Sequence, residues 1–188
     1  MCLGLVILFL IPYLIVNHLP ITRTTLPFLF HENLIPFLPW TFVIYFSAFI
    51  QELIIIRCIP KPLLLKTVWV GLVTLACGLI IFILFPTRYP RELYPSDNIL
   101  INLFRMIDSP ANCFPSLHVT GFILFSTCFS LLKKPIILNV LIWLWTIIVI
   151  ISVLTTKQHY VLDIFGGILL SIPAIIILRN IFRKYENA

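Results

Sequence analysis

Long apolar runs alternate with short polar connections along most of the chain. Each run is bounded by charged residues or by prolines, and most approach the roughly 20 apolar residues that a helix needs to cross a bilayer. We therefore predict an all-α integral membrane bundle of about six transmembrane helices. Their expected limits are 2–17, 38–56, 65–86, 117–132, 135–156 and 158–180, and the fourth is short for a full span.

No internal repeat, low-complexity tract or flexible linker divides the chain, so we expect a single domain over residues 1–188. The first run, Leu3 to Val16, lacks the positive n-region and the small-residue cleavage site of a removable signal peptide, which predicts a retained helix. The longest connection, from Pro86 to Pro115, is too long to be only a turn, and we expect it to be functional.

Composition supports a membrane class and excludes several others. Hydrophobic residues make up 61% of the chain and charged residues 11%, against roughly one half and one quarter in soluble domains. The net charge of +6 comes from basic residues scattered in ones and twos, so we expect no nucleic-acid partner. The five cysteines show no CxxC spacing, and we expect no metal, no disulfide framework and no cofactor.

The distribution of charge predicts the orientation. With six spans, both termini fall on one side together with most of the basic residues, and the positive-inside rule makes that side cytoplasmic. This set is Arg57, Lys61, Lys66, Lys133, Lys134, Arg179, Arg183 and Lys184. The outer set is Arg23, Arg88, Arg91, Arg105 and Lys157, balanced by five acidic residues. We expect a multi-pass protein of a bacterial inner membrane with its site facing the periplasm or exterior; a eukaryotic lumenal membrane is the alternative.

The first polar cluster runs from Asp108 to His118 and leads directly into the fourth apolar run. Ser116 after a proline is typical of a helix N-cap. Ser116 and Leu117 would then start a helix whose free N–H groups and positive dipole end form an anion site. His118, in the first turn, would lie beside a bound phosphate. An interfacial histidine on a capped helix is the structural alternative.

The second cluster runs from Ser152 to Asp163. On a helix, His159 and Asp163 share one face, so the carboxylate can hold one imidazole nitrogen while the other faces a substrate. This is the base and orienting group of a nucleophilic site, although a structural His–Asp pair is the alternative. Both clusters are expected at the outer ends of helices, where they supply the nucleophile, the proton donor and the fixed positive charge that phosphoryl transfer needs.

These two clusters resemble motifs of the type 2 phosphatidic acid phosphatase family, which is similar to lipid phosphotransferases and vanadium haloperoxidases. Residues 114–118, Phe-Pro-Ser-Leu-His, resemble its central PSGH motif, in the PSLH form of the inositol phosphorylceramide synthase branch. Residues 157–163 resemble the end of its third motif, SRxxxxxHxxxD. The resemblance implies a six-helix bundle in which His159 is the nucleophile, Asp163 orients it, and His118 protonates the leaving group.

The chain departs from the family pattern at two phosphate-binding positions. The third-motif arginine falls at Val153, and Lys157 is a possible substitute. The first motif, KxxxxxxRP, is not present as written, and we expect Arg88 or Arg91 to replace it. The alternative for these arginines is snorkelling to lipid headgroups.

The leading hypothesis is a metal-independent phosphatase that hydrolyses a lipid phosphate or diphosphate through a phosphohistidine on His159. A lipid phosphotransferase, in which an alcohol takes the phospho-headgroup, uses the same residues and stays open. A non-catalytic membrane scaffold or transporter is the third hypothesis. The expected partners are a lipid phosphate substrate and membrane lipids; neither the identity of the lipid nor the oligomeric state follows from the sequence.

Overall fold

The computed structural model describes residues 2–29 and 32–187, and the side chains of all of these except residues 2–6. Seven α-helices lie in this part of the chain. They are α1 (Cys2–Asn17), α2 (Phe42–Cys58), α3 (Lys61–Leu84), α4 (Ile99–Ile107), α5 (Leu117–Leu131), α6 (Ile136–Thr155) and α7 (Val161–Glu186). Two short strands, β1 (Thr24–Thr25) and β2 (Thr87–Arg88), pair in parallel.

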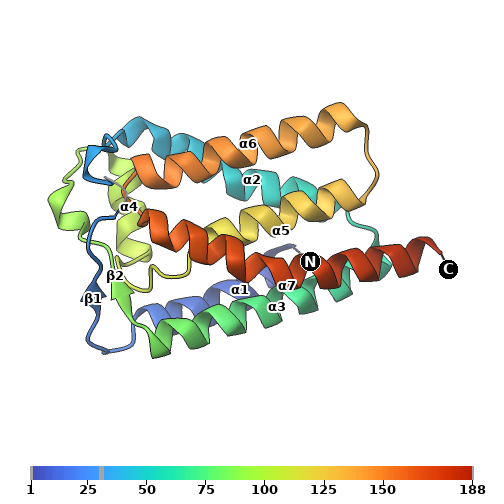
Figure 1. Cartoon of the computed structure of the whole chain (residues 1–188), viewed down its shortest axis with the longest axis horizontal. Coiled ribbons are helices and arrows are strands. Elements are labelled where there is room, and N and C mark those ends of the chain that lie inside the picture. Colours follow the sequence, from blue (N-terminus) through green and yellow to red (C-terminus); the bar gives the residue numbers. More distant parts are fainter. Residues whose placement is uncertain (1, 30–31, 188) are drawn as a thin grey trace.

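The longer helices lie side by side as an elongated bundle, and α4, β1 and β2 gather at one end of it (Figure 1). We call this the loop end. It also holds the last turns of α3 and α6 and the first turns of α5 and α7 (Figure 1). The α5–α6 connection and the end of α7 lie at the opposite end. Polar residues of the long connections are thereby collected at one end of the bundle.

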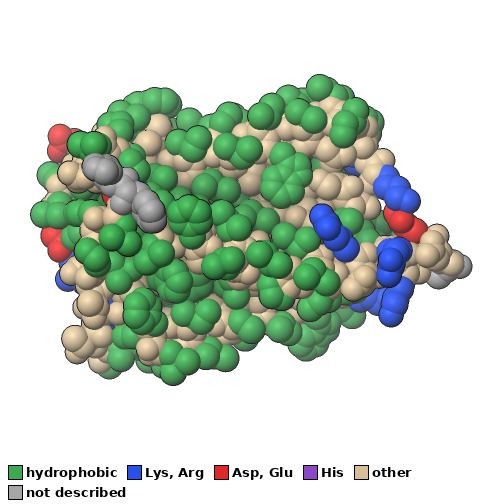
Figure 2. Space-filling model, viewed as in Figure 1, with side chains coloured by type: hydrophobic (Ala, Val, Ile, Leu, Met, Phe, Trp, Pro, Cys, Tyr) green, Lys and Arg blue, Asp and Glu red, His purple; other side chains and the backbone are tan. Residues whose placement is uncertain are grey.

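The surface of the bundle is that of a membrane protein. Hydrophobic side chains cover its middle, and Lys and Arg side chains gather where α7 ends (Figure 2). Among the residues that the structure describes, four helical segments are long and apolar enough to cross a membrane: Pro39–Cys58, Lys61–Leu84, Ile136–Thr155 and Val161–Glu186. The apolar helices α1 and α5 are shorter, and α5, with 15 residues, spans only about 22 Å of a hydrocarbon core about 30 Å thick.

Helix α5 is the centre of the bundle, since it packs against α2, α3, α6 and α7. Its contact with α7 depends on two glycines. A Cβ added at Gly167 would lie 2.5 Å from the carbonyl oxygen of Ser116, and one at Gly166 would lie 2.5 Å from the ring of Phe114. The Thr120 hydroxyl donates to the Gly167 carbonyl at 3.0 Å. Glycine at these positions therefore lets the start of α5 dock directly on α7.

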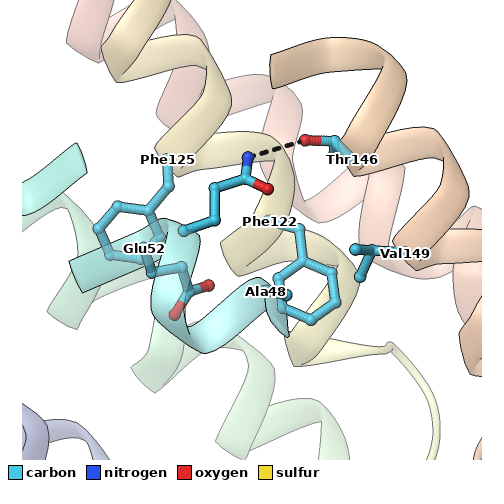
Figure 3. Close-up of a pocket in the computed structure, with 7 residues that line it drawn as sticks. Ala48, Glu52, Phe122, Phe125, Thr146 and Val149 are labelled. Atoms are coloured by element: carbon cyan, nitrogen blue, oxygen red, sulfur yellow. Dashed lines mark hydrogen bonds between the residues drawn. The ribbon is translucent and has the colours of Figure 1, made fainter. Parts of the chain in front are cut away.

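A small hollow inside the bundle lies between α2, α5 and α6 (Figure 3). The Gln51 amide beside it donates to the hydroxyls of Ser126 and Thr146, at 3.3 and 3.2 Å, and the side chain of Glu52 lines it (Figure 3). The hollow has no room for a water molecule. We read it as a packing defect between polar side chains of the core rather than as a substrate site.

The six expected helices are all observed, with shifted ends. Helix α3 begins at Lys61 rather than at residue 65, because Pro62 is tolerated in the first helical turn. Helix α7 covers Val161–Glu186 rather than 158–180. The pattern of apolar runs missed α4, a nine-residue helix inside the connection from Pro86 to Pro115. The side chain of Asn98 caps its start by accepting from two backbone N–H groups.

Candidate active site

His159 lies immediately before α7 and is held by two acceptors. Its Nδ1 is 3.2 Å from Oδ2 of Asp163 and 3.1 Å from the carbonyl oxygen of Cys113. Since both partners can only accept, Nδ1 carries a proton, and Nε2 of the neutral ring keeps its lone pair. The expected His159–Asp163 contact is present.

The contact arises differently from the way the spacing suggested. His159 is not part of α7, because Tyr160 is the N-cap residue of that helix. Oδ2 of Asp163 accepts the Tyr160 N–H at 2.8 Å and faces His159 as well. Asp163 therefore has two functions: it caps α7 and it orients the imidazole. Its side chain is fully buried, which shields both hydrogen bonds from water.

His118 faces His159 from the first turn of α5. Its Nδ1 lies 3.4 Å from Nε2 of His159. Ser116 is the N-cap of α5, as expected, and its hydroxyl accepts from the Val119 N–H at 3.3 Å. The Ser116 N–H donates to the Asp163 carbonyl at 2.9 Å, so the two helix starts are joined directly. The two histidines, 41 residues apart in the sequence, thus meet at the loop end.

Both predicted anion-binding positions lie at the start of α5, but they differ. Ser116 is fully buried, and its backbone N–H and hydroxyl are both used within the protein. Leu117 is the first residue of α5, and its N–H is one of those for which a helix has no internal acceptor. Its side chain packs on α3 at Gly78. Leu117 therefore has a backbone donor beside His118, whereas Ser116 shapes the turn.

Aromatic rings surround the rest of His118. Ring centroids lie at 5.6 Å for Tyr45, 6.1 Å for Phe49, 6.3 Å for Tyr13 and 6.4 Å for Phe122. These rings come from α1, α2 and α5. They exclude water from one side of the imidazole, so that its polar neighbours lie toward His159.

Arg91 forms a buried ion pair that the sequence analysis did not anticipate. Its guanidinium donates to the Asp108 carbonyl oxygen at 2.6 Å and to Asp108 Oδ2 at 3.0 Å, and the Tyr13 hydroxyl donates to Asp108 Oδ1. Burial alone would raise the pKa of Asp108, but the positive charges of Arg91 and His118 and these hydrogen bonds lower it. No pattern in the sequence singles out Tyr13, which lies within an apolar run.

Arg88 is placed differently from Arg91. Its guanidinium is partly exposed and pairs with Glu92 at 2.5 Å. Its carbonyl oxygen accepts a hydrogen bond from the Tyr160 hydroxyl at 3.1 Å. Tyr160 follows His159 in the chain. The backbone of Arg88 therefore supports the His159 loop, while its charge lies at the surface.

Lys157 is buried, and its backbone adopts the left-handed conformation, with φ of 56°. Its ammonium group donates to the Glu32 carbonyl oxygen at 3.1 Å and lies 4.9 Å from the ring centroid of Tyr94. Burial lowers the pKa of Lys157, and the nearby Glu32 opposes this shift. The position of the third-motif arginine, Val153, is fully buried in an apolar cluster, so no charge reaches the site from there.

Glu32 is a second residue that sequence reasoning missed. Its Oε1 accepts the Val161 N–H at 2.9 Å, at the start of α7. Burial raises the pKa of Glu32. Together with its contact to Lys157, this hydrogen bond attaches the α1–α2 connection to the loop that carries His159. Its only signal in the sequence was its place among the outer acidic residues.

One group of possible metal ligands occurs among residues 2–29 and 32–187: Cys113, His159 and Asp163, whose ligand atoms lie within 4.8 Å of one another. A metal would need the thiolate form of Cys113. Burial and the charge of Asp163 raise the pKa of this thiol, and its S–H donates to the Pro110 carbonyl at 3.3 Å. These features favour the protonated thiol over a metal ligand.

Comparison with known families identifies this arrangement. The sequence model of the PAP2 superfamily matches residues 14–177, which include every predicted site residue from Arg88 to Asp163. The chain belongs to the PAP2 superfamily. The resemblance to the type 2 phosphatidic acid phosphatases is therefore confirmed, and PAP2 membership supports phosphatase-type activity on phosphate esters. No curated protein matches the chain significantly, and no solved structure does so either.

Proposed function

We propose that this PAP2 protein is a metal-independent phosphatase that hydrolyses a lipid phosphate or diphosphate through a phosphohistidine on His159. One observation carries the proposal. Nδ1 of His159 contacts Oδ2 of Asp163 and the carbonyl oxygen of Cys113, while Nε2 faces His118. A neutral imidazole held in this way is an activated nucleophile with a defined direction of attack.

The reaction has two steps. Nε2 of His159 attacks phosphorus, the bond to the leaving oxygen breaks, and His118 in its protonated form gives that oxygen a proton. His118 then takes a proton from water, which attacks the phosphohistidine and releases phosphate. Asp163 stabilises the charged imidazole during both steps. No atom fits between the two ring nitrogens at 3.4 Å, so binding of the phosphate requires the His118 side chain to turn away from His159.

Positive charge for the phosphate oxygens comes from several candidates. Arg91 is the strongest replacement for the phosphate-binding charge of the first motif. It is buried near His118, and its Nε has no partner among the described residues. Lys157 and the N–H of Leu117 are further donors. Arg88 is a weaker candidate, since its guanidinium pairs with Glu92 at the surface.

The position of these residues supports a lipid substrate. They lie at the loop end, next to an apolar surface that suits acyl chains (Figure 2). We propose that all six apolar helices span the bilayer within one domain, with both termini cytoplasmic and the site at the outer face of a bacterial inner membrane. The eight basic residues of the proposed cytoplasmic set support this orientation, since they lie in the last turn of α2, the first two turns of α3, the α5–α6 connection and the last turns of α7. A reporter after Lys134 should read as cytoplasmic and one between Arg91 and Asn98 as external.

A lipid phosphotransferase is the second candidate. It is favoured by the PSLH form of the central motif, Pro115 to His118, which resembles the inositol phosphorylceramide synthase branch. The first step is unchanged, and an alcohol takes the place of water in the second. A non-catalytic scaffold is less favoured, because it gives no reason for three polar side chains from two helix starts to contact one another in series, His118 to His159 at 3.4 Å and His159 to Asp163 at 3.2 Å.

The test is phosphate release by the purified protein from a panel of lipid phosphates and diphosphates, with and without alcohol acceptors. We expect release that survives EDTA and is inhibited by vanadate, which mimics trigonal bipyramidal phosphorus. A new phosphodiester in place of free phosphate would assign the transferase function. Loss of activity with EDTA and its return with magnesium would refute the metal-independent mechanism.

A further inference from the structure

Helix α4 turns its apolar face outward, whereas a helix at a water-exposed surface turns its polar face outward. The apolar side chains on its outward arc are Ile99, Leu100, Leu103, Met106 and Ile107. Met106 is 80% exposed and Ile99 69% exposed. Five large apolar side chains on about two and a half turns of helix form a surface that water solvates poorly.

The inward face of α4 contains its only charged residue. Arg105 is half-buried, donates to the Tyr94 carbonyl at 2.9 Å and lies 5.8 Å from the ring centroid of Phe37. Ile101 beside it is fully buried. A cation turned inward and an apolar face turned outward are expected where the surroundings are lipid rather than water.

The position of α4 along the bundle indicates which part of a bilayer it meets. The Phe104 ring packs on Phe42 and Tyr45, with centroids at 5.3 and 5.4 Å. These residues belong to the first two turns of the candidate span Pro39–Cys58. The first turn of a spanning helix lies where acyl chains meet headgroups. The exposed side chains of Val43 and Phe46 continue the apolar surface along α2.

We infer that the outward face of α4 is a membrane-docking surface, immersed among the acyl chains of the leaflet at the loop end. At nine residues, α4 is about 13 Å long and cannot span the bilayer. It is held to the bundle by Phe104 and Ile101 and to the lipid by its outward side chains.

This surface also indicates where a lipid reaches the active site, a step that rests on the proposed function. The Tyr45 ring contacts both Phe104 of α4 and His118, with centroids at 5.4 and 5.6 Å. One ring therefore separates the docked helix from the catalytic histidine. A lipid can leave its acyl chains in the bilayer beside α4 and α2 while its phosphate reaches His159.

The docking surface is tested first by measuring depth, without reference to activity. A nitroxide is attached at Met106→Cys in protein reconstituted into phosphatidylglycerol–phosphatidylethanolamine nanodiscs, with Cys2 and the exposed Cys58 and Cys77 replaced by serine. We expect relaxation at position 106 to be enhanced more by oxygen, which concentrates in acyl chains, than by an aqueous nickel chelate. Asp97→Cys, in the exposed loop before α4, is the control and should show the reverse. Equal access of the nickel chelate to both positions would overturn the proposal.

A second experiment tests the link to the substrate. Leu103→Asp/Met106→Asp places two charges on the docking surface, while Asn102→Asp, which also removes the Asn102 donor to the Ser96 carbonyl, places one at the exposed edge of the same helix as a control. The double variant should hydrolyse dioleoyl phosphatidate in vesicles about tenfold more slowly, because charge at the acyl boundary is costly. Its rate on soluble dihexanoyl phosphatidate should not change.

The outcomes separate the two levels of the proposal. An equal loss of rate on both substrates, or no loss on vesicles, rejects entry beside α4. If the unsubstituted protein hydrolyses neither phosphatidate, nor any other lipid phosphate, the proposed function fails, while the nitroxide measurement still decides whether α4 lies in the membrane.

Discussion

Replacing Asp163 with asparagine separates orientation of His159 from the role of nucleophile that we propose for it. The carboxylate Oδ2 accepts two hydrogen bonds, from the Tyr160 N–H at 2.8 Å and from His159 Nδ1 at 3.2 Å. Asparagine has one acceptor oxygen and one amide group of similar shape. If the oxygen takes the Oδ2 position, both bonds survive without the negative charge. If the amide group faces His159, it favours the tautomer with a proton on Nε2, which cannot attack phosphorus.

The size of the effect follows from the second acceptor of His159. In serine hydrolases the corresponding change lowers kcat by about 10,000-fold. Here the Cys113 carbonyl oxygen, 3.1 Å from Nδ1, still favours the reactive tautomer. The loss is then mainly that of one charge-assisted hydrogen bond to the imidazolium, about 1.5–3 kcal/mol, which corresponds to roughly 10- to 150-fold in kcat. We expect Asp163→Asn to lie in this range.

The assay compares kcat of the unsubstituted protein, Asp163→Asn and His159→Ala on a soluble short-chain phosphatidate. It also measures acid-labile, alkali-stable phosphoenzyme after rapid quenching in alkali. Thermal unfolding in the same detergent controls for misfolding. His159→Ala should have no measurable phosphoenzyme. The reasoning is refuted if Asp163→Asn keeps more than about a third of the rate, or if it is as inactive as His159→Ala with an unchanged Tm.

Three further substitutions and one pH dependence test the site and its support. His118→Ala should lower turnover of a lipid phosphate by about 100- to 10,000-fold but be partly rescued by an activated aryl phosphate, whereas rescue of His159→Ala instead would mean that the two roles are reversed. Gly167→Ala adds a Cβ 2.5 Å from a backbone carbonyl of α5 and should destabilise the fold by about 1–3 kcal/mol, seen as a lower Tm. Arg91→Ala leaves the Asp108 carboxylate buried and unpaired, at a cost of about 3–5 kcal/mol, which an unfolding curve would detect. The pKa of Asp108 is lowered in the folded protein, so its carboxylate should contribute fully to the free energy of unfolding above about pH 4, the pKa in the unfolded chain. This contribution should decline as the pH falls through the folded pKa. It should be absent in Asp108→Asn.

The apolar runs were sufficient to predict the main helices, because each run approaches the length that a spanning helix needs and has few competing structures in a bilayer. The same method missed α4. Nine residues with an outward apolar face do not form a run long enough to stand out from the connection around them, and the surface that they cover depends on packing against Phe42 and Tyr45 of α2.

The candidate catalytic residues were also predictable, because two short motifs carry them. The reason for the contact between His159 and Asp163 was not. The spacing suggested two residues on one helix, whereas Asp163 reaches back across the helix start to a residue outside α7. A four-residue spacing allows both arrangements, and only the position of the first helical turn distinguishes them.

The sequence by itself determined that the chain is helical and apolar, which residues are candidates for phosphoryl-transfer chemistry, and where the helix starts that hold them lie. Only the tertiary structure decided how the candidate phosphate-binding charges are paired. Arg91 is buried against Asp108, Arg88 pairs with Glu92 at the surface, and Lys157 contacts the Glu32 carbonyl. The physical reason is that helix formation depends on neighbouring residues, whereas the pairing of a charge depends on which distant segment of the chain packs beside it.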